Sequence, residues 1–346
     1  MRLNLKLFLV LKRQFFASEQ PSCRNRAVGK FACIGDQDWM PREGHGREKE
    51  ISGMMHHRRI GEADVYNIVE LIGPTHDPSR VFADLPRPAF AAAVARLGPT
   101  QYAAVIDRLI VGIQIWVVRI GSDVVIVDTG VGNHKPRGLP RFDRLNTLVP
   151  LWLAAAGAAP AQVTQVIMTH LHGDHVGWNT VRDGDGWART FPNATYWMPR
   201  KDYDWWLPRY HEAKGVGETE AFVDAVEPLI DTGHFQFYDE GQEFVPGLTA
   251  RAAYGHTPGQ MRVDLTSDGK RGSFCADIFH SPLQILHPHL NTPFCVEQET
   301  ARSTRAAFLD EVADSGTLIM PCHFGAPHCG TVVRAGTGYD FVPEGA

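Results

Sequence analysis

The stretch that most constrains this chain is residues 168–178, which read Met-Thr-His-Leu-His-Gly-Asp-His-Val-Gly-Trp. It holds four side chains that can bind metal ions: His170, His172, Asp174 and His175. The apolar run at 163–168 predicts a buried strand that ends at this loop. On an extended segment, residues two apart point the same way, so His170 and His172 can face one cation. Gly173 then permits a sharp turn, and the last two side chains can face a second cation. This density of ligands favours metal binding over chance histidines in a polar surface loop.

Further metal-competent residues stand at the ends of other predicted strands. The β-rich runs 109–118 and 123–127 are joined by residues 119–122, and the second run ends at Asp128. A carboxylate there could orient metal-bound histidines, or it could close the strand with an ordinary Asx-turn.

Three more strand ends carry candidate residues. His256 has turn residues on both sides, Gly255 before it and Pro258-Gly259 after it, so we expect this histidine on a loop. A hairpin over 262–276 ends at Asp277, and the run 317–321 leads into His323. Because loops at strand ends usually carry function, we expect all these side chains to meet at one site.

Tryptophans accompany the candidate ligands. Trp178 follows His175 by three residues, so we expect it at the site. The aromatic pair Trp205 and Trp206 could line an apolar substrate pocket or fill the core. His211 and His328 are expected at the surface, and His287 and His289 belong to a loop over the cavity or to an extra metal site.

Composition limits the domain organisation. The 346 residues, 44% of them hydrophobic, suffice for one large two-layer core or two small domains. Residues 12–57 are rich in Gly, Arg and Glu and have little periodicity, so they cannot bury enough apolar surface to order themselves. We therefore expect residues 1–55 to be a disordered or loosely attached extension and residues 56–346 to form one catalytic domain.

Charge and cysteine usage exclude several classes of partner. The formal charge is 34 − 39 = −5 without a dense Lys/Arg run, which argues against nucleic acid as the main partner. The apolar run at 7–11 is too short for a signal peptide or a membrane span. Six scattered cysteines without CxxC spacing favour free thiols in a reducing compartment. These observations predict a cytoplasmic protein that binds no membrane.

From about residue 60 to the C-terminus, the sequence resembles the metallo-β-lactamase-fold hydrolase superfamily. The motifs that carry the resemblance are Asp128-Thr129-Gly130, the HxHxDH loop, Gly255-His256-Thr257-Pro258-Gly259, Asp277 after a strand, and His323. The resemblance implies an α/β fold of the αββα sandwich type. It also implies that His170, His172 and His256 hold one metal, that Asp174, His175 and His323 hold the other, and that Asp277 bridges them.

Within that superfamily the chain is most similar to methyl parathion hydrolase and its lactone- and aryl-ester-hydrolysing relatives. Supporting segments are Phe191-Pro192-Asn193-Ala194, Val245-Pro246-Gly247-Leu248, residues 276–280 and the tail 336–343. Acyl-homoserine lactonases commonly place a tyrosine three residues after the bridging aspartate, where this chain has His280. If His280 faces the cavity it would hydrogen-bond a substrate oxygen; otherwise it is a structural histidine under the loop.

The function implied is a dinuclear hydrolase in which a hydroxide bridging two metal ions attacks a lactone or an aryl ester, while Asp174 relays the proton. Oxygen and nitrogen ligands without thiolate favour two zinc ions, with manganese, cobalt or iron as alternatives. The expected substrate is small, neutral and apolar, and a homodimer is compatible with the chain. Alternatives are a phosphotriester hydrolase, a β-lactamase- or glyoxalase-like hydrolase, an iron-dependent redox enzyme, and a metal-stabilised binding protein.

Overall fold

The computed structural model describes residues 54–230 and 232–345. The extension predicted for residues 1–55 therefore lies almost entirely outside the described residues. The described residues all belong to one compact unit.

One sheet is built from the N-terminal half of this unit. Its order is β1-β2-β4-β5-β6-β9-β10, with β3 paired to β4. The pairs from β1 to β5 are antiparallel, whereas β5, β6, β9 and β10 run parallel. The strands are β1 (Met55–Ile60), β2 (Ala63–His76), β3 (Tyr102–Ala103), β4 (Arg108–Ile120), β5 (Asp123–Val127), β6 (Gln165–Ile167), β9 (Thr195–Pro199) and β10 (Phe235–Tyr238).

The second sheet comes from the C-terminal half and has the order β11-β12-β13-β14-β15-β16-β17. Its neighbours are antiparallel except β14 and β15, which are parallel. The strands are β11 (Glu243–Val245), β12 (Leu248–Ala252), β13 (Met261–Ser267), β14 (Lys270–Ala276), β15 (Leu318–Pro321), β16 (Gly330–Ala335) and β17 (Gly338–Pro343). A separate hairpin pairs β7 (Thr180–Asp183) with β8 (Gly186–Arg189).

The two sheets pack face to face. Their shared core contains Val118 and Val125 from the first sheet together with Val263 from the second. The ring of Trp116 on β4 meets that of Phe274 on β14 edge to face, with centroids 5.8 Å apart. The strands are rich in Val and Ile because both faces of β4 and β5 are covered, which favours β-branched apolar side chains.

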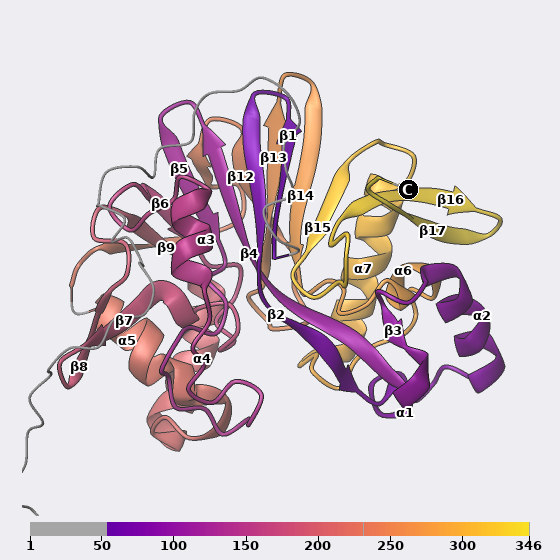
Figure 1. The fold of residues 1–346 in the computed structure, drawn as a ribbon, viewed down its shortest axis with the longest axis horizontal. Helices are drawn as coiled ribbons and strands as arrows, with labels where there is room; N and C mark the ends of the chain where they lie inside the picture. The colour runs from indigo at the N-terminus through magenta and orange to yellow at the C-terminus, as the bar shows by residue number, and fades with distance from the viewer. Residues whose placement is uncertain (1–53, 231, 346) are drawn as a thin grey trace, which may run out of the picture. The chain divides into compact units, whose positions relative to one another are not determined.

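Helices cover the outer faces of the sheets (Figure 1). Helices α3, α4 and α5 lie beside the first sheet, and α7 lies beside β15 and β16. The bounds are α1 (Pro78–Val81), α2 (Arg87–Leu97), α3 (Val149–Ala155), α4 (Arg200–Ala213), α5 (Glu227–Ile230), α6 (Leu283–Leu286) and α7 (Gln298–Val312), with short 3₁₀ turns at Ala104–Ile106, Gly177–Asn179 and Gly217–Thr219 and a π-helix at Phe222–Val226. This arrangement confirms the predicted αββα sandwich.

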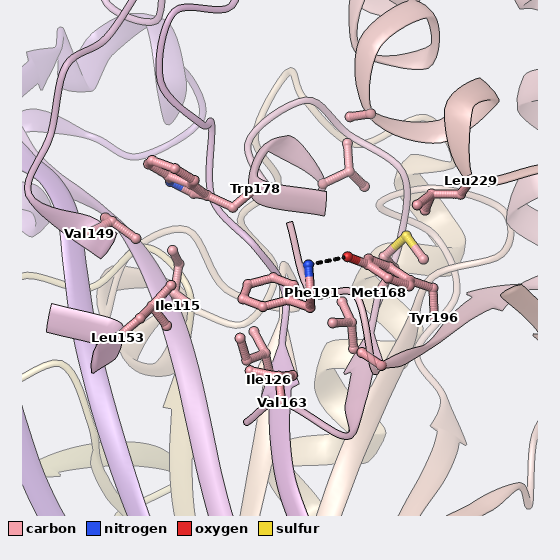
Figure 2. Packing of buried hydrophobic residues seen from close by; sticks show 14 of the residues in the cluster. Ile115, Ile126, Val149, Leu153, Val163, Met168, Trp178, Phe191, Tyr196 and Leu229 are labelled. Carbon is pink, nitrogen blue, oxygen red and sulfur yellow. Dashed lines mark hydrogen bonds between the residues drawn. The ribbon is translucent and has the colours of Figure 1, made fainter. Parts of the chain in front are cut away.

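The outer core of the first sheet contains one of the predicted site residues. Figure 2 shows Trp178 in this cluster together with Val149 and Leu153 of the α3 helix. In the same cluster the backbone N–H of Phe191 donates to the Tyr196 hydroxyl at 3.0 Å. In the described residues, no helix has the length and apolarity needed to cross a membrane.

Candidate metal centre

Four strand ends deliver the predicted ligands to one place. The HxHxDH loop follows β6, His256 follows β12, Asp277 directly follows β14, and His323 lies two residues after β15. Parallel pairing of β14 with β15 brings the last two residues together at one edge of the second sheet. The fold therefore brings these loops together, as expected from the sequence.

The first ligand group consists of three imidazoles. Nε2 of His170 lies 3.0 Å from Nδ1 of His172, and Nε2 of His256 lies 2.8 Å from the same nitrogen. The three side chains form a group whose nitrogen atoms could hold one metal ion. The ligand nitrogens all lie within 4.8 Å of one another, which is close enough for one cation to bind all three.

The second group combines a carboxylate with two imidazoles. Nε2 of His175 lies 3.8 Å from Oδ1 of Asp174, and Nε2 of His323 lies 3.9 Å from Oδ2 of Asp174. These three residues form another candidate metal group. Asp174 is the more open member, since its side chain is 19% exposed.

Asp277 stands between the groups. Its Oδ1 lies 3.4 Å from Nε2 of His175, in the second group. Its Oδ2 lies 3.3 Å from Nε2 of His256, in the first group, and 3.0 Å from Nε2 of His323. One carboxylate therefore reaches both groups with its two oxygens.

Asp128 orients the second group. Nδ1 of His175 donates to Oδ2 of Asp128 at 2.9 Å, which leaves the lone pair of Nε2 facing the site. The carboxylate is itself held by the backbone N–H and the hydroxyl of Thr169, each at 2.8 Å. Asp128 adopts φ 56°, a conformation that Asp tolerates better than most residues.

A backbone carbonyl performs the same task for His323. The carbonyl oxygen of Gly112 lies 2.9 Å from Nδ1 of His323, and a carbonyl can only accept, so this nitrogen carries the proton. The backbone N–H of Gly112 donates to the carbonyl of His323 at 3.0 Å. The tautomer of His323 is thus fixed with its Nε2 lone pair toward the site.

Electrostatics differ between the two groups. Burial lowers the pKa of His172 to about 4 and lowers those of His170 and His256 well below the ordinary value, so these imidazoles are neutral. Burial also disfavours charge on His175 and His323, but the nearby carboxylates together outweigh it. Asp277, Asp128 and Asp174 raise the pKa of His175, and Asp277 and Asp174 raise that of His323. The carboxylates therefore make the second group favourable to positive charge.

These residues fit bound divalent metal. Nε2 of His175 and Oδ1 of Asp277 are buried and make no hydrogen bond with any described residue. Buried polar atoms without partners are costly, and a coordinated cation would satisfy them. The donor set of imidazole nitrogens and carboxylate oxygens is one that zinc and similar ions prefer.

Comparison with known families agrees with this geometry. The family model described as the metallo-beta-lactamase superfamily matches residues 110–323. The chain belongs to the metallo-beta-lactamase superfamily. Family membership and the two convergent ligand groups together make it a metal-dependent hydrolase. No curated protein matches the chain.

Solved structures of this superfamily share the fold. The hydrolase AbOPH is 24% identical with a TM-score of 0.71, and the match covers 85% of this chain and 98% of that one. AidC, a dizinc quorum-quenching lactonase in complex with the product N-hexanoyl-L-homoserine, is 20% identical with a TM-score of 0.68, covering 84% and 98%. A probable metal-dependent hydrolase from Staphylococcus aureus is 17% identical with a TM-score of 0.64, covering 84% and 99%.

The predicted aromatic residues of this metallo-beta-lactamase-superfamily protein lie in different surroundings. The ring of Trp206 is buried and lies 5.4 Å from that of His172, and Trp205 is half-buried and contacts Trp206 edge to face. Trp178 is buried, and its Nε1–H donates to a carboxylate oxygen of Glu70 at 2.7 Å. Trp206 is therefore beside the first ligand group with Trp205 against it, whereas Trp178 lies in the core cluster of the first sheet.

His280 lies inside the centre. Its Nε2 is 3.3 Å from Oδ2 of Asp277, and its ring stacks on that of His323 with an interplanar angle of 6°. The exposed ring of Phe294 lies 5.5 Å from it, and the Thr292 hydroxyl lies 3.5 Å from its Nδ1. The sequence offered no sign that residues 292–295 reach the site.

Other residues near the centre were also missed. Asp202, in the first turn of α4, accepts the backbone N–H of Leu171 at 2.8 Å and so holds the loop between two ligands. Burial raises the pKa of Asp202 to about 6. Arg141 donates from Nη2 to the Val111 carbonyl at 2.7 Å. Burial lowers the pKa of Arg141, and the nearby carboxylate of Asp174 opposes this change.

One expectation about the histidines was wrong. His328 was expected at the surface, but it is buried, and Gln114 and the Phe324 carbonyl contact its Nδ1. The loop after His323 folds inward, so this histidine serves packing there. His211 is exposed, as expected.

Proposed function

We propose that the protein is a dinuclear hydrolase that opens lactones or cleaves aryl esters. The observation that carries this proposal is the position of Asp277 between the two groups. Its Oδ1 lies 3.4 Å from His175, and its Oδ2 lies 3.3 Å from His256 and 3.0 Å from His323. A carboxylate in that position suits a pair of ions that share one bridging ligand. Zinc is the preferred metal, and manganese, cobalt and iron are alternatives.

Two bound cations supply an activated water at neutral pH and polarise the carbonyl that is attacked. The protein's own part is orientation and proton transfer. Asp174 is partly exposed and lies within 4 Å of both histidines of its group, so we assign it the task of taking a proton from the water and passing it to the leaving oxygen. Nε2 of His280 makes no hydrogen bond with the described residues, so it would contact a substrate oxygen.

The aromatic side chains beside the ligands support an apolar substrate. Trp206 lies next to His172 with Trp205 against it, and Phe294 lies next to His280. Flat apolar surfaces of this kind favour a ring or an acyl chain. AidC, which has the same fold, is described as a lactonase, and this likeness supports a lactone as the substrate. The buried free thiols Cys275, Cys295, Cys322 and Cys329 support a reducing, cytoplasmic location.

The test is a substrate panel with purified protein. Dihydrocoumarin, an aryl acetate, an acyl-homoserine lactone and methyl paraoxon are offered to the wild type, to His172→Ala and to His211→Ala, and the metal content of each protein is counted. His211 is an exposed histidine of α4 and serves as the matched control.

We expect two metals per chain and turnover of the lactone or aryl ester that falls by more than about 100-fold in His172→Ala, with no change in His211→Ala. Turnover of methyl paraoxon alone would replace the proposal with a phosphotriesterase. Full metal content without turnover of any substrate would contradict it and favour a metal-stabilised binding protein.

A further inference from the structure

Glu70 occupies an irregular position in β2. Along the β2–β4 ladder Val69 stands opposite Gln114 and Leu71 stands opposite Ile113, so Glu70 is an extra residue in a β-bulge. A bulge redirects the side chain of the extra residue. Glu70 is 3% exposed, so its carboxylate points into the protein.

Three donors surround this carboxylate. Oε2 accepts the backbone N–H of Val131 at 2.6 Å, and Oε1 accepts that of Gly132 at 3.1 Å. Oε1 also accepts Nε1–H of Trp178 at 2.7 Å. The first two donors lie in the loop after Asp128, and the third lies three residues after His175. Glu70 therefore joins two segments that both lead directly from the metal centre.

Those two segments are also bonded to each other. The backbone N–H of Thr129 donates to the His175 carbonyl at 2.8 Å, and that of Trp178 donates to the Thr129 carbonyl at 2.9 Å. Gly130 adopts φ +61°, and a Cβ there would overlap the carboxylate of Glu70. The close approach of bulge and loop thus depends on glycine.

From this geometry we propose that Glu70 is a positioning residue for the Asp174–His175–His323 half of the metal centre. It touches none of these ligands and acts through the two loops: one carries Asp128, which orients His175, and the other carries Asp174 and His175 themselves. The inference rests on the proposed dinuclear function, because it assigns Glu70 to one of two cation sites.

A carboxylate suits this role better than an amide. Burial raises the pKa of Glu70 to about 7, although its three donors oppose the rise. A buried carboxylate is costly, but a glutamine of the same shape would turn an N–H toward a donor that needs an acceptor. Replacing Glu70 with Gln therefore disturbs the two loops with little change in packing volume.

The experiment measures the affinity of each of the two metal ions. Chelator-treated wild type and Glu70→Gln are titrated with zinc against a competing chromophoric chelator. We expect one ion to change by less than about threefold in affinity. The other ion, which we assign to the Asp174–His175–His323 half, should lose about 10–100-fold, the range for loss of a group that orients ligands. Trp178→Phe removes one of the three donors to Glu70 and is expected to weaken binding of the same ion by a smaller factor. If Glu70→Gln does not fold, this second variant tests the inference.

A core variant controls for general loosening. Val163 belongs to the same buried cluster as Trp178 but makes none of these hydrogen bonds, so Val163→Ala should keep both affinities. Equal weakening of both ions, or of neither, in Glu70→Gln would overturn the inference. A wild type that binds fewer than two ions would overturn the proposed function as well, so the two failures are distinguishable.

Discussion

Nδ1 of His175 and Oδ2 of Asp128 are 2.9 Å apart, and this hydrogen bond joins the end of β5 to the loop after β6. The bond fixes which nitrogen of His175 faces Asp174 and Asp277. Because Asp128 is also held by both donors of Thr169, the imidazole has little freedom to turn. The position of a ligand is thus determined by a residue that faces away from the site.

Asp128→Asn should weaken metal binding without unfolding the protein. The amide keeps the size of the side chain but loses the charge and one acceptor for the groups that donate to Asp128. We expect the ion held by Asp174, His175 and His323 to bind about 10–100-fold more weakly, as chelator competition would measure. Asp268→Asn, in the exposed turn between β13 and β14, is the control. Unchanged affinity in Asp128→Asn would contradict the orienting role.

The buried cluster of Asp224 with Lys135 and Arg137 makes a strong prediction about stability. Nζ of Lys135 lies 3.2 Å from Oδ1 of Asp224, and Nη1 of Arg137 lies 2.6 Å from Oδ2. Asp224→Ala would leave two buried cations without their partner, so we expect a loss of about 3–5 kcal/mol in the free energy of unfolding. Urea unfolding measures it. Asp310→Ala, which breaks an exposed pair with Arg334, should change stability little.

Asp202 predicts a specific pH dependence. Its pKa is raised from 3.8 to about 6 by burial, so the folded state holds this proton more tightly than the unfolded state does. The stabilisation is complete below pH 3.8 and is lost as the pH rises to about 6, with a size of about 3 kcal/mol.

The unfolding free energy of the wild type should therefore fall relative to that of Asp202→Asn over this range. Urea titrations of both proteins at several pH values give the difference. If the difference in unfolding free energy between the two proteins did not change with pH, Asp202 would not titrate as described.

Gly177 lies where the two site loops touch. A Cβ at this position would overlap the backbone carbonyl of Val131, and backbone atoms cannot move aside cheaply. Gly177→Ala should cost about 1–3 kcal/mol or more in thermal unfolding. At Gly73 a Cβ would meet nothing within 4 Å, so Gly73→Ala is the matched control and should behave like the wild type. Equal stability of the two variants would refute the close packing of these loops.

That the proposed ligands meet at one place could be predicted from the sequence, because each one stands at the end of a strand or in a dense local motif. The HxHxDH loop, Gly255-His256, Asp277 and His323 all follow β-rich runs, and the structure has strands at those runs. Such patterns depend on neighbouring residues alone, and they are visible in a single chain.

The supporting residues could not be predicted, since their roles depend on contacts across long sequence separations. Glu70 is one polar residue among the apolar residues of β2, and only the bulge directs it to Trp178, 108 residues away. Asp202 lay in an aromatic segment whose helical start brings it to Leu171. His328 is buried because the loop after His323 turns inward, which its sequence does not signal.

The most direct test of the central claim is a zinc titration followed by lactone turnover. Chelator-treated protein receives increasing zinc, and the initial rate of dihydrocoumarin hydrolysis is measured at each ratio of zinc to chain. A dinuclear centre predicts that the rate rises until two equivalents are bound and is then constant. A full rate at one equivalent, or no hydrolysis at any ratio, would contradict a dinuclear lactone hydrolase.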